Sequence, residues 1–219
     1  MKDYILFDLD GTLTDPKEGI TKSVRHALNH YGIQVEDLDS LCPFIGPPLA
    51  ESFERFYGFA PETAREAVLV YREYFADRGW SENLEYPGIR ELLARLKDAG
   101  KHLFVATSKP EVFAERILKH FGMDGFFEII GGADLEETRV KKADVIRYVL
   151  ARAGLEGPGA VDQAVMVGDR EHDVLGAREV SMDSVGVLYG YGSRREFEAC
   201  RPMAVVETVS DLERLLLTL

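Results

Sequence analysis

The sequence predicts an α/β protein, with a doubly wound, parallel, Rossmann-like sheet and an all-helical cap domain inserted after the first strand. Two observations lead to this fold class. Short apolar runs alternate with amphipathic segments along most of the chain, which is typical of a parallel sheet covered by helices on both faces. The exception is the stretch 16–80, where apolar residues recur only at helical spacing.

The expected strands are short, mostly apolar runs, as in strands buried on both faces of a sheet. The helices between them are bounded by residues that favour helix ends: Pro110 suits a first turn, while Gly100 and Gly154 suit the position after a last turn. Ser210 and Glu213 have the spacing of a capping box at the start of a final helix. The expected strands are 4–7, 102–106, 126–130, 164–167 and 184–188, and the helices are 88–99, 110–121 and 140–153.

The inserted segment follows the first strand closely. Ile20, Val24 and Leu28 share one helical face, and a second helical pattern follows Pro61. The pair Pro87-Gly88 marks the return to the alternating pattern. We therefore expect a core domain of residues 1–14 and 84–219 and a helical cap domain of residues 15–83.

The net charge of −12 argues against nucleic acid and anionic membrane surfaces as partners, because both carry negative charge. No apolar run approaches the roughly 20 residues that a membrane-spanning helix needs. The first residues become acidic too early for a signal peptide, so we expect a cytoplasmic protein. Monomer and homodimer both stay open.

Two aspartates, Asp8 and Asp10, come directly after the first expected strand. In an extended chain they point the same way, so two carboxylates crowd together at one strand end. Asp and Gly are also common in ordinary turns, but this crowding is costly unless a cation or a proton neutralises it. Because ligands bind at the carboxyl ends of strands in open α/β sheets, we favour a functional site here.

A second acidic pair, Asp169 and Asp173, follows the expected strand 164–167. A helix beginning there brings residues four apart to one face. If the two strands are neighbours, Asp8, Asp10 and Asp169 converge. Oxygen ligands of this kind suit Mg²⁺.

Hydroxyl and ammonium groups follow other strands and are candidates for binding phosphate oxygens. Thr107-Ser108-Lys109 comes after the expected strand 102–106, and Lys141-Lys142 opens a helix. Each is a weak signal alone, since lysines at helix starts are usually solvated. Their order along alternating strands and helices strengthens them.

Together these motifs resemble the haloacid dehalogenase-like hydrolase superfamily, and in particular its phosphoglycolate phosphatase-like branch. The resemblance covers essentially the whole chain and is carried by the motif Asp8-Leu-Asp10-Gly-Thr12, the apolar run ending in Thr107-Ser108, a lysine, and Gly-Asp169 followed by Asp173. It implies an Mg²⁺-dependent phosphatase with an aspartyl-phosphate intermediate.

The resemblance also implies roles for individual residues. Asp8 is the expected nucleophile, and Asp10 the acid that protonates the leaving alcohol and the base that later activates water. Thr107 hydrogen-bonds the phosphoryl group. Lys142 steadies nucleophile and phosphate, and we prefer it to Lys141 because Arg139-x-x-Lys142 matches a variant pattern of this branch.

For the metal, the resemblance implies that Asp8, the backbone carbonyl of Asp10 and Asp169 hold Mg²⁺, with Asp173 supporting them from outside. Thr12, Ser108 and Gly46 are our candidates for substrate binding. Gly46 lies in the stiff Pro- and Gly-containing loop 42–49, which either selects the substrate or is a plain turn between helices.

The sequence also argues against several functions other than that of a phosphatase. Dehalogenases of this superfamily lack the second aspartate and phosphonate hydrolases replace it with alanine, so Asp10 favours ester hydrolysis. A phosphomutase of the β-phosphoglucomutase type is the alternative function, weakened because the loop 42–49 has no basic residue. A signalling receiver domain lacks the inserted cap, and an inactive binding protein would not keep every catalytic residue type. We therefore expect a phosphatase acting on a small phosphorylated metabolite, either phosphoglycolate-like or a nucleoside monophosphate.

Overall fold

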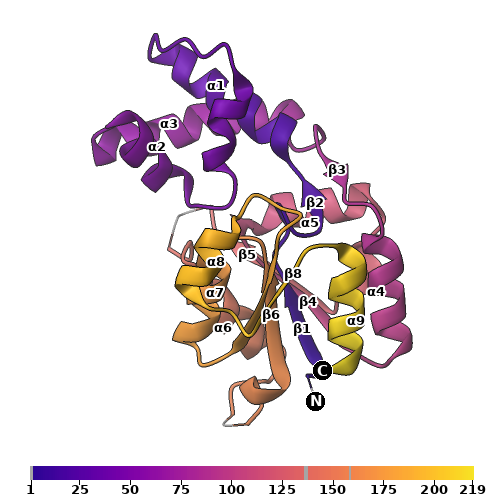
Figure 1. Cartoon of the computed structure of the whole chain (residues 1–219). Coiled ribbons are helices and arrows are strands. Elements are labelled where there is room, and N and C mark those ends of the chain that lie inside the picture. Colours follow the sequence, from indigo (N-terminus) through magenta and orange to yellow (C-terminus); the bar gives the residue numbers. More distant parts are fainter. Residues whose placement is uncertain (1, 136–137, 158) are drawn as a thin grey trace. The chain divides into compact units, whose positions relative to one another are not determined.

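A computed structural model describes residues 2–135, 138–157 and 159–219 of the chain (Figure 1). It divides into two compact units. The core unit consists of Met1–Asp15 and Glu85–Leu219, and the inserted unit is Pro16–Leu84. The connecting segments β2 (Thr14–Asp15) and β3 (Leu84–Glu85) pair as a two-stranded sheet.

The core unit is built on a six-stranded sheet in the order β5-β4-β1-β6-β7-β8, and its neighbouring strands pair in parallel. This topology confirms the predicted doubly wound α/β fold. The first strand lies inside the sheet, which explains why its residues are almost wholly apolar. The strands are β1 (Tyr4–Phe7), β4 (His102–Pro110), β5 (Ile129–Ala133), β6 (Ala164–Gly168), β7 (Asp183–Val187) and β8 (Ala204–Val206).

Helices cover both faces of this sheet, with α4 and α9 on one side and α6, α7 and α8 on the other (Figure 1). Leu6, Met166 and Phe104 project from neighbouring strands into one cluster with Val145 and Val149 of α6. Each large apolar side chain buried in this way contributes about 1.5–3 kcal/mol. The helices are α4 (Ile89–Asp98), α5 (Glu111–His120), α6 (Lys142–Arg152), α7 (Glu171–Glu179), α8 (Arg194–Cys200) and α9 (Val209–Thr218).

The inserted unit is helical, as predicted, and has an aromatic cluster of its own. Phe44 packs against Phe53 and Phe56, with ring centroids 5.0 and 5.4 Å away. Phe44, which belongs to the loop 42–49, is therefore part of the packing of this unit, which favours a plain turn over substrate selection for that part of the loop. The elements are α1 (Lys17–His30), the 3₁₀ segment η1 (Leu38–Phe44), α2 (Leu49–Tyr57), α3 (Pro61–Tyr74) and the π-helical turn η2 (Phe75–Gly79).

The predicted strand 126–130 is displaced by three residues in the structure, where β5 runs from Ile129 to Ala133. Phe126 ends a 3₁₀ turn, and the strand instead continues through Gly131 and Gly132. A Cβ atom on Gly131 would lie 2.3 Å from Val149, and one on Gly132 would lie 2.5 Å from the carbonyl oxygen of Lys109. Close packing thus requires glycines inside this strand, although glycine usually weakens a strand prediction.

The predicted capping box at Ser210 and Glu213 is also wrong by two residues. Thr208 caps α9 and accepts a hydrogen bond from the backbone N–H of Asp211 at 3.1 Å. The structure adds α8 and β8, which the sequence did not reveal because their apolar residues are few. These differences leave the arrangement of the central strands unchanged.

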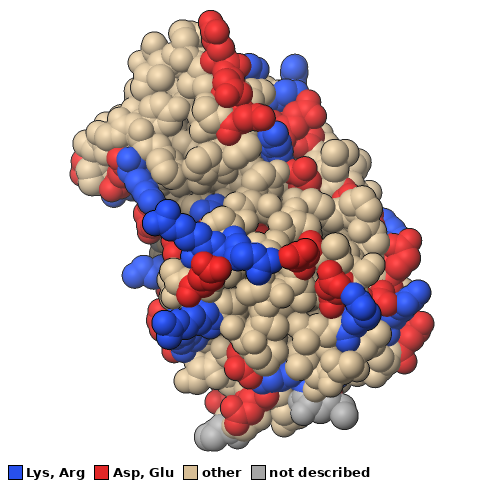
Figure 2. Space-filling model, in the orientation of Figure 1, with Lys and Arg blue, Asp and Glu red and all other residues tan. Residues whose placement is uncertain are grey.

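Within the described residues, no helix combines the length and apolar character needed to cross a bilayer. Acidic and basic side chains are mixed over the face drawn in Figure 2. The net charge of −12 therefore does not form one continuous acidic surface on that face.

Candidate active site

The register of the central strands brings the two acidic motifs together. Phe7 of β1 pairs with Val167 of β6, and the backbone N–H of Asp8 donates to the carbonyl oxygen of Val167 at 2.9 Å. Asp8 and Asp169 therefore leave neighbouring strands at the same edge of the sheet. Carboxylate oxygens of Asp8, Asp169 and Asp173 lie within 4.8 Å of one another, and all three residues are buried.

Asp10 sits in a tight turn that follows the first strand. The backbone N–H groups of Leu13 and Thr14 both donate to the carbonyl oxygen of Leu9, and Gly11 allows the turn with a φ of 82°. This turn directs the Asp10 carboxylate to Lys109, whose Nζ lies 2.8 Å from Oδ2. The Asp10 side chain is thus outside the three-carboxylate group, and its Oδ1 has no hydrogen-bond partner among the described residues.

Lys142 forms ion pairs with Asp8 of the first acidic motif and with Asp173 of the second. Its Nζ lies 2.8 Å from Oδ1 of Asp8 and 2.8 Å from Oδ1 of Asp173, and it donates to the carbonyl oxygen of Ala106 at 3.1 Å. Its side chain is only 4% exposed, whereas Lys141 is exposed and precedes the first residue of α6. The structure therefore places Lys142, and not Lys141, beside Asp8.

An irregularity at the end of β4 positions Thr107 and Lys109. The pairing of β4 with β5 shifts between Ala106 and Pro110, as in the β-bulges that often re-aim side chains near active sites. Both residues are buried, and the Thr107 hydroxyl accepts a hydrogen bond from the backbone N–H of Lys109 at 3.2 Å. Sequence reasoning named Lys109 as a candidate for binding phosphate oxygens but did not foresee its pairing with Asp10, because a bulge that turns a lysine inward leaves no pattern in the sequence.

The three candidates for substrate binding differ in their surroundings. Thr12 is fully buried, and its hydroxyl oxygen has no hydrogen-bond partner within the part of the chain that is described. Ser108 is half-buried beside Thr107. Gly46 belongs to the inserted unit, where a φ of 104° lets it turn the chain between η1 and α2. Of these, Thr12 lies in the turn that follows β1 and carries the first acidic motif, and Ser108 lies in β4 next to Thr107.

Burial and mutual repulsion raise the pKa values of several carboxyls in the site. Burial raises the pKa of Asp169 well above its usual range, and the charges of Asp173 and Asp8 add to the effect. Burial likewise raises the pKa values of Asp173 and Asp10, opposed by Lys142 at the former and by Lys109 at the latter. A cation bound between these carboxyls would be favourable, because its positive charge would offset both the cost of burying ionised carboxylates and their mutual repulsion.

Lys142 stays protonated despite its burial. Desolvation works to lower its pKa, but the carboxylates of Asp173 and Asp8 outweigh desolvation and keep the pKa above the usual value for lysine. A permanent positive charge thus lies next to Asp8. Such a charge can stabilise the negative charge on a transferring phosphoryl group.

The site fits a divalent cation. Among the described residues, the buried carboxylates of Asp8, Asp10, Asp169 and Asp173 pair with two buried ammonium groups, those of Lys109 and Lys142, so this group carries two more negative than positive charges when all four carboxyls are ionised. In addition, the buried Oδ1 of Asp169 has no hydrogen-bond partner among the described residues. Oxygen ligands of this type are those that Mg²⁺ prefers.

Sequence reasoning missed the segment Tyr189–Gly192, which follows β7. The backbone N–H of Tyr191 donates to Oδ2 of Asp169 at 2.8 Å. The alternation of tyrosine and glycine in this segment is a possible signal, since glycines often mark a close approach of two backbones.

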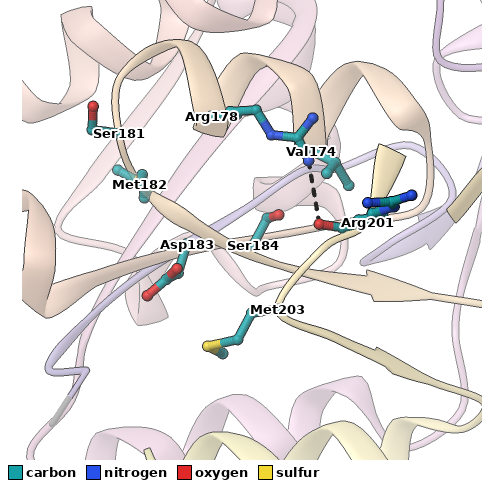
Figure 3. A pocket seen from close by; sticks show the side chains of 8 residues that line it. All are labelled: Val174, Arg178, Ser181, Met182, Asp183, Ser184, Arg201 and Met203. Atoms are coloured by element: carbon teal, nitrogen blue, oxygen red, sulfur yellow. Dashed lines mark hydrogen bonds between the residues drawn. The ribbon is translucent and has the colours of Figure 1, made fainter. Parts of the chain in front are cut away.

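A separate hollow of about 230 Å³ lies at the opposite edge of the sheet, near the amino end of β7 (Figure 3). Arg178, Ser184 and Arg201 are among its lining residues. The Arg178 guanidinium donates to the carbonyl oxygens of Cys200 and Arg201, so it holds the end of α8 in place. We therefore regard this hollow as a feature of the packing between α7 and the end of α8, and not as a binding site.

Comparison with known proteins identifies the family to which the chain belongs. The sequence model of the haloacid dehalogenase-like hydrolases matches residues 5–187. The chain belongs to this family. The family prediction made from the sequence motifs is therefore confirmed, and the protein is a hydrolase.

Relatives within the haloacid dehalogenase-like family carry more than one functional name. A 5'-nucleotidase from Pseudomonas aeruginosa is 47% identical over 212 residues, which cover 97% of this chain and 94% of that protein. Tyrosine-protein kinase PtkA from Mycobacterium tuberculosis is 44% identical over 211 residues, or 96% of this chain and 70% of that protein. The crystal structure of a predicted phosphatase from Clostridium acetobutylicum has a TM-score of 0.96 and 48% identity, with 100% of both chains covered.

Proposed function

We propose that this hydrolase is a phosphatase that cleaves a small-molecule phosphate monoester through an aspartyl-phosphate on Asp8. The observation that carries the proposal is the environment of Asp8. Its buried carboxylate lies 2.8 Å from the ammonium group of Lys142 and beside the carboxylates of Asp169 and Asp173. A carboxylate oriented by a buried cation, at an edge of the sheet where ligands bind, is suited to attack phosphorus.

In the first step an Asp8 oxygen forms a bond to phosphorus while the bond from phosphorus to the ester oxygen breaks. Asp10 gives its proton to the departing oxygen, so the leaving group departs as a neutral alcohol. In the second step a water oxygen attacks phosphorus, Asp10 takes a proton from that water, and the bond to Asp8 breaks. Inorganic phosphate leaves, and both aspartates return to their starting states.

Charge stabilisation falls to Lys142 and to the bound cation. Mg²⁺, when bound, would offset negative charge on the phosphoryl oxygens. Asp8, Asp169 and the backbone carbonyl of Asp10 are the proposed ligands, and Asp173 holds Lys142 while accepting a hydrogen bond from the backbone N–H of Arg170 at 3.1 Å. Thr107 and Thr12 are the proposed hydroxyl contacts to the phosphate.

For the substrate, we propose a phosphorylated metabolite, either phosphoglycolate-like or a nucleoside monophosphate. The name of the 47% identical relative, 5'-nucleotidase, supports a nucleotide. The net charge of −12 supports a small substrate over nucleic acid. A phosphomutase of the β-phosphoglucomutase type is the second candidate, and the lack of basic residues in the loop 42–49 counts against it.

The test is release of inorganic phosphate from a panel of metabolites with Mg²⁺, run on the wild type, on Asp8→Asn and on Asp98→Asn. Asp98 ends α4 and is exposed, so it is a matched control for the change of charge. We expect the wild type and Asp98→Asn to release phosphate equally and Asp8→Asn to lose nearly all activity.

Other outcomes would overturn parts of the proposal. Full activity in Asp8→Asn would show that Asp8 is not the nucleophile. Failure of the wild type to hydrolyse even p-nitrophenyl phosphate would exclude a phosphatase. Isomerisation of a sugar phosphate without phosphate release would favour the mutase, and transfer of label from ATP to a tyrosine peptide would favour the activity named in PtkA.

A further inference from the structure

The segment Tyr189–Gly192 has no part in the proposed chemistry. It contacts both Asp169 and the loop 8–15, which carries Asp8 and Asp10. Its backbone holds Asp169, because the N–H of Tyr191 donates to Oδ2 at 2.8 Å. This bond occupies the second carboxylate oxygen and leaves Oδ1, which has no other partner in the described chain, as the oxygen available to a cation.

The two tyrosine hydroxyls of the segment reach the loop 8–15, which carries Asp8 and Asp10. Tyr189 donates to the backbone carbonyl oxygen of Thr12 at 3.1 Å, and Tyr191 donates to the carboxylate of Asp15. The same short segment is therefore bonded to Asp169 on one side and at two points to the loop 8–15 on the other.

Glycines make this double contact possible. A Cβ atom on Gly190 would lie 2.2 Å from the carbonyl oxygen of Gly11 and 2.6 Å from Oδ2 of Asp169. One on Gly192 would lie 1.8 Å from the carbonyl oxygen of Asp169. The segment is thus packed directly between the two acidic motifs, with no room for side chains at these positions.

We propose that Tyr189 and Tyr191 are positioning residues that hold the loop 8–15 at a fixed spacing from Asp169 and thereby raise the affinity of the site for a divalent cation. The inference rests on the proposed Mg²⁺ site. Groups that orient metal ligands from outside typically change metal affinity by about 10- to 100-fold when they are removed. Neither tyrosine touches the reacting atoms, so their effect passes through Asp169 and the loop.

The test measures binding of Mn²⁺ alone to the full-length protein, using the electron paramagnetic resonance signal of free Mn²⁺. Mn²⁺ accepts the same oxygen ligands as Mg²⁺. The variants are Tyr189→Phe, Tyr191→Phe and the double variant, which keep the rings, including the contact of Tyr189 with Tyr86 at 5.2 Å between centroids. Tyr148→Phe is the matched control, because its hydroxyl donates to Glu111 within the same unit, at 3.5 Å.

We expect the dissociation constant for Mn²⁺ to rise about tenfold in the double variant and less in each single variant, with Tyr148→Phe unchanged. A melting temperature that falls while the dissociation constant stays within twofold of the wild-type value would overturn the inference, since it would make both tyrosines purely structural. If the double variant does not fold, the single variants decide in the same way. If the wild type binds no Mn²⁺, the proposed metal site itself is wrong, which is a separate outcome.

Discussion

At the scale of single residues, the two aspartates of the first motif, Asp8 and Asp10, each pair with a different buried lysine. Lys142 pairs with Asp8 and Asp173, and Lys109 pairs with Asp10, each at 2.8 Å. The proposed nucleophile and the proposed acid and base therefore have separate cationic partners. This separation lets the two carboxylates be tested one at a time.

Lys142→Met should impair both stability and activity. Removing one partner of a buried ion pair typically costs about 3–5 kcal/mol, because Asp8 and Asp173 would keep uncompensated charge. Urea denaturation should show this loss, and kcat should fall at least about a hundredfold as charge stabilisation is lost. Lys141→Met is the matched control, since its exposed side chain should change stability by less than about 0.5 kcal/mol. Equal effects of the two changes would contradict the assignment of Lys142.

Lys109→Met should shift the pH dependence of the reaction. Burial raises the pKa of Asp10, and Lys109 opposes that rise, so its removal should raise the pKa further. The base step needs the Asp10 carboxylate, so the acidic limb of the kcat profile should move to higher pH. The acid step needs the protonated form, so the alkaline limb of phosphoenzyme formation should also move to higher pH. If both limbs stay at their wild-type pH values, Lys109 does not influence the pKa at which Asp10 acts in the reaction.

At the scale of elements, the ends of β4 and β5 shape the site through close backbone packing. The register shift in β4 turns Lys109 inward, and β5 passes within contact distance of it at Gly132. A strand that contains glycines is weak in isolation, so this one depends on its neighbours. Part of the site therefore relies on an element with little local preference for its structure.

Gly132→Ala tests this dependence. The added Cβ would lie 2.5 Å from the carbonyl oxygen of Lys109 and 2.7 Å from backbone atoms of Glu111, none of which can move without shifting the chain. We expect a loss of about 1–3 kcal/mol in the free energy of unfolding, measured with urea. Gly125→Ala, where nothing lies within 4 Å of the added atom, should show a much smaller change. A Gly132→Ala protein as stable as the control would refute the close packing of β5.

At the scale of the whole molecule, the concentration of buried carboxylates should make the metal-free protein respond unusually to pH. Burial raises the pKa values of Asp169, Asp173 and Asp10 in the folded state. A raised folded pKa means that the folded protein binds protons that the unfolded chain releases. The contribution of these groups to stability is therefore greatest at low pH and is lost as pH rises through the folded pKa values.

We accordingly expect these groups to make the metal-free protein more stable as pH falls from 7 towards the unfolded aspartate pKa of roughly 3.9. Saturating Mg²⁺ should reduce this gain, because a bound cation favours the ionised carboxylates. Thermal unfolding from pH 5 to pH 7.5, with Mg²⁺ and with a chelator, measures both slopes. Because other titrating groups contribute equally to both slopes, their difference isolates the site. Identical slopes in the two conditions would argue against a cation at the site.

The sequence by itself determined the fold class and most of the acidic site. Asp8 and Asp169 each follow an apolar run, and the ends of neighbouring parallel strands meet at one edge of a sheet. Their convergence therefore follows from local patterns and general rules of topology. The helical nature of the inserted segment could also be predicted from a local pattern, because its apolar residues repeat at helical spacing.

Only the tertiary structure decided the partners of these aspartates. Adjacent lysines at a helix start point in different directions, and the packing of α6 selected Lys142 over Lys141. The β4 irregularity turned Lys109 inward, and a segment about 20 residues from Asp169 brought Tyr191 to it. Such contacts join residues that are distant in the chain, so their geometry depends on how the strands and loops pack and leaves no periodic signal in the sequence.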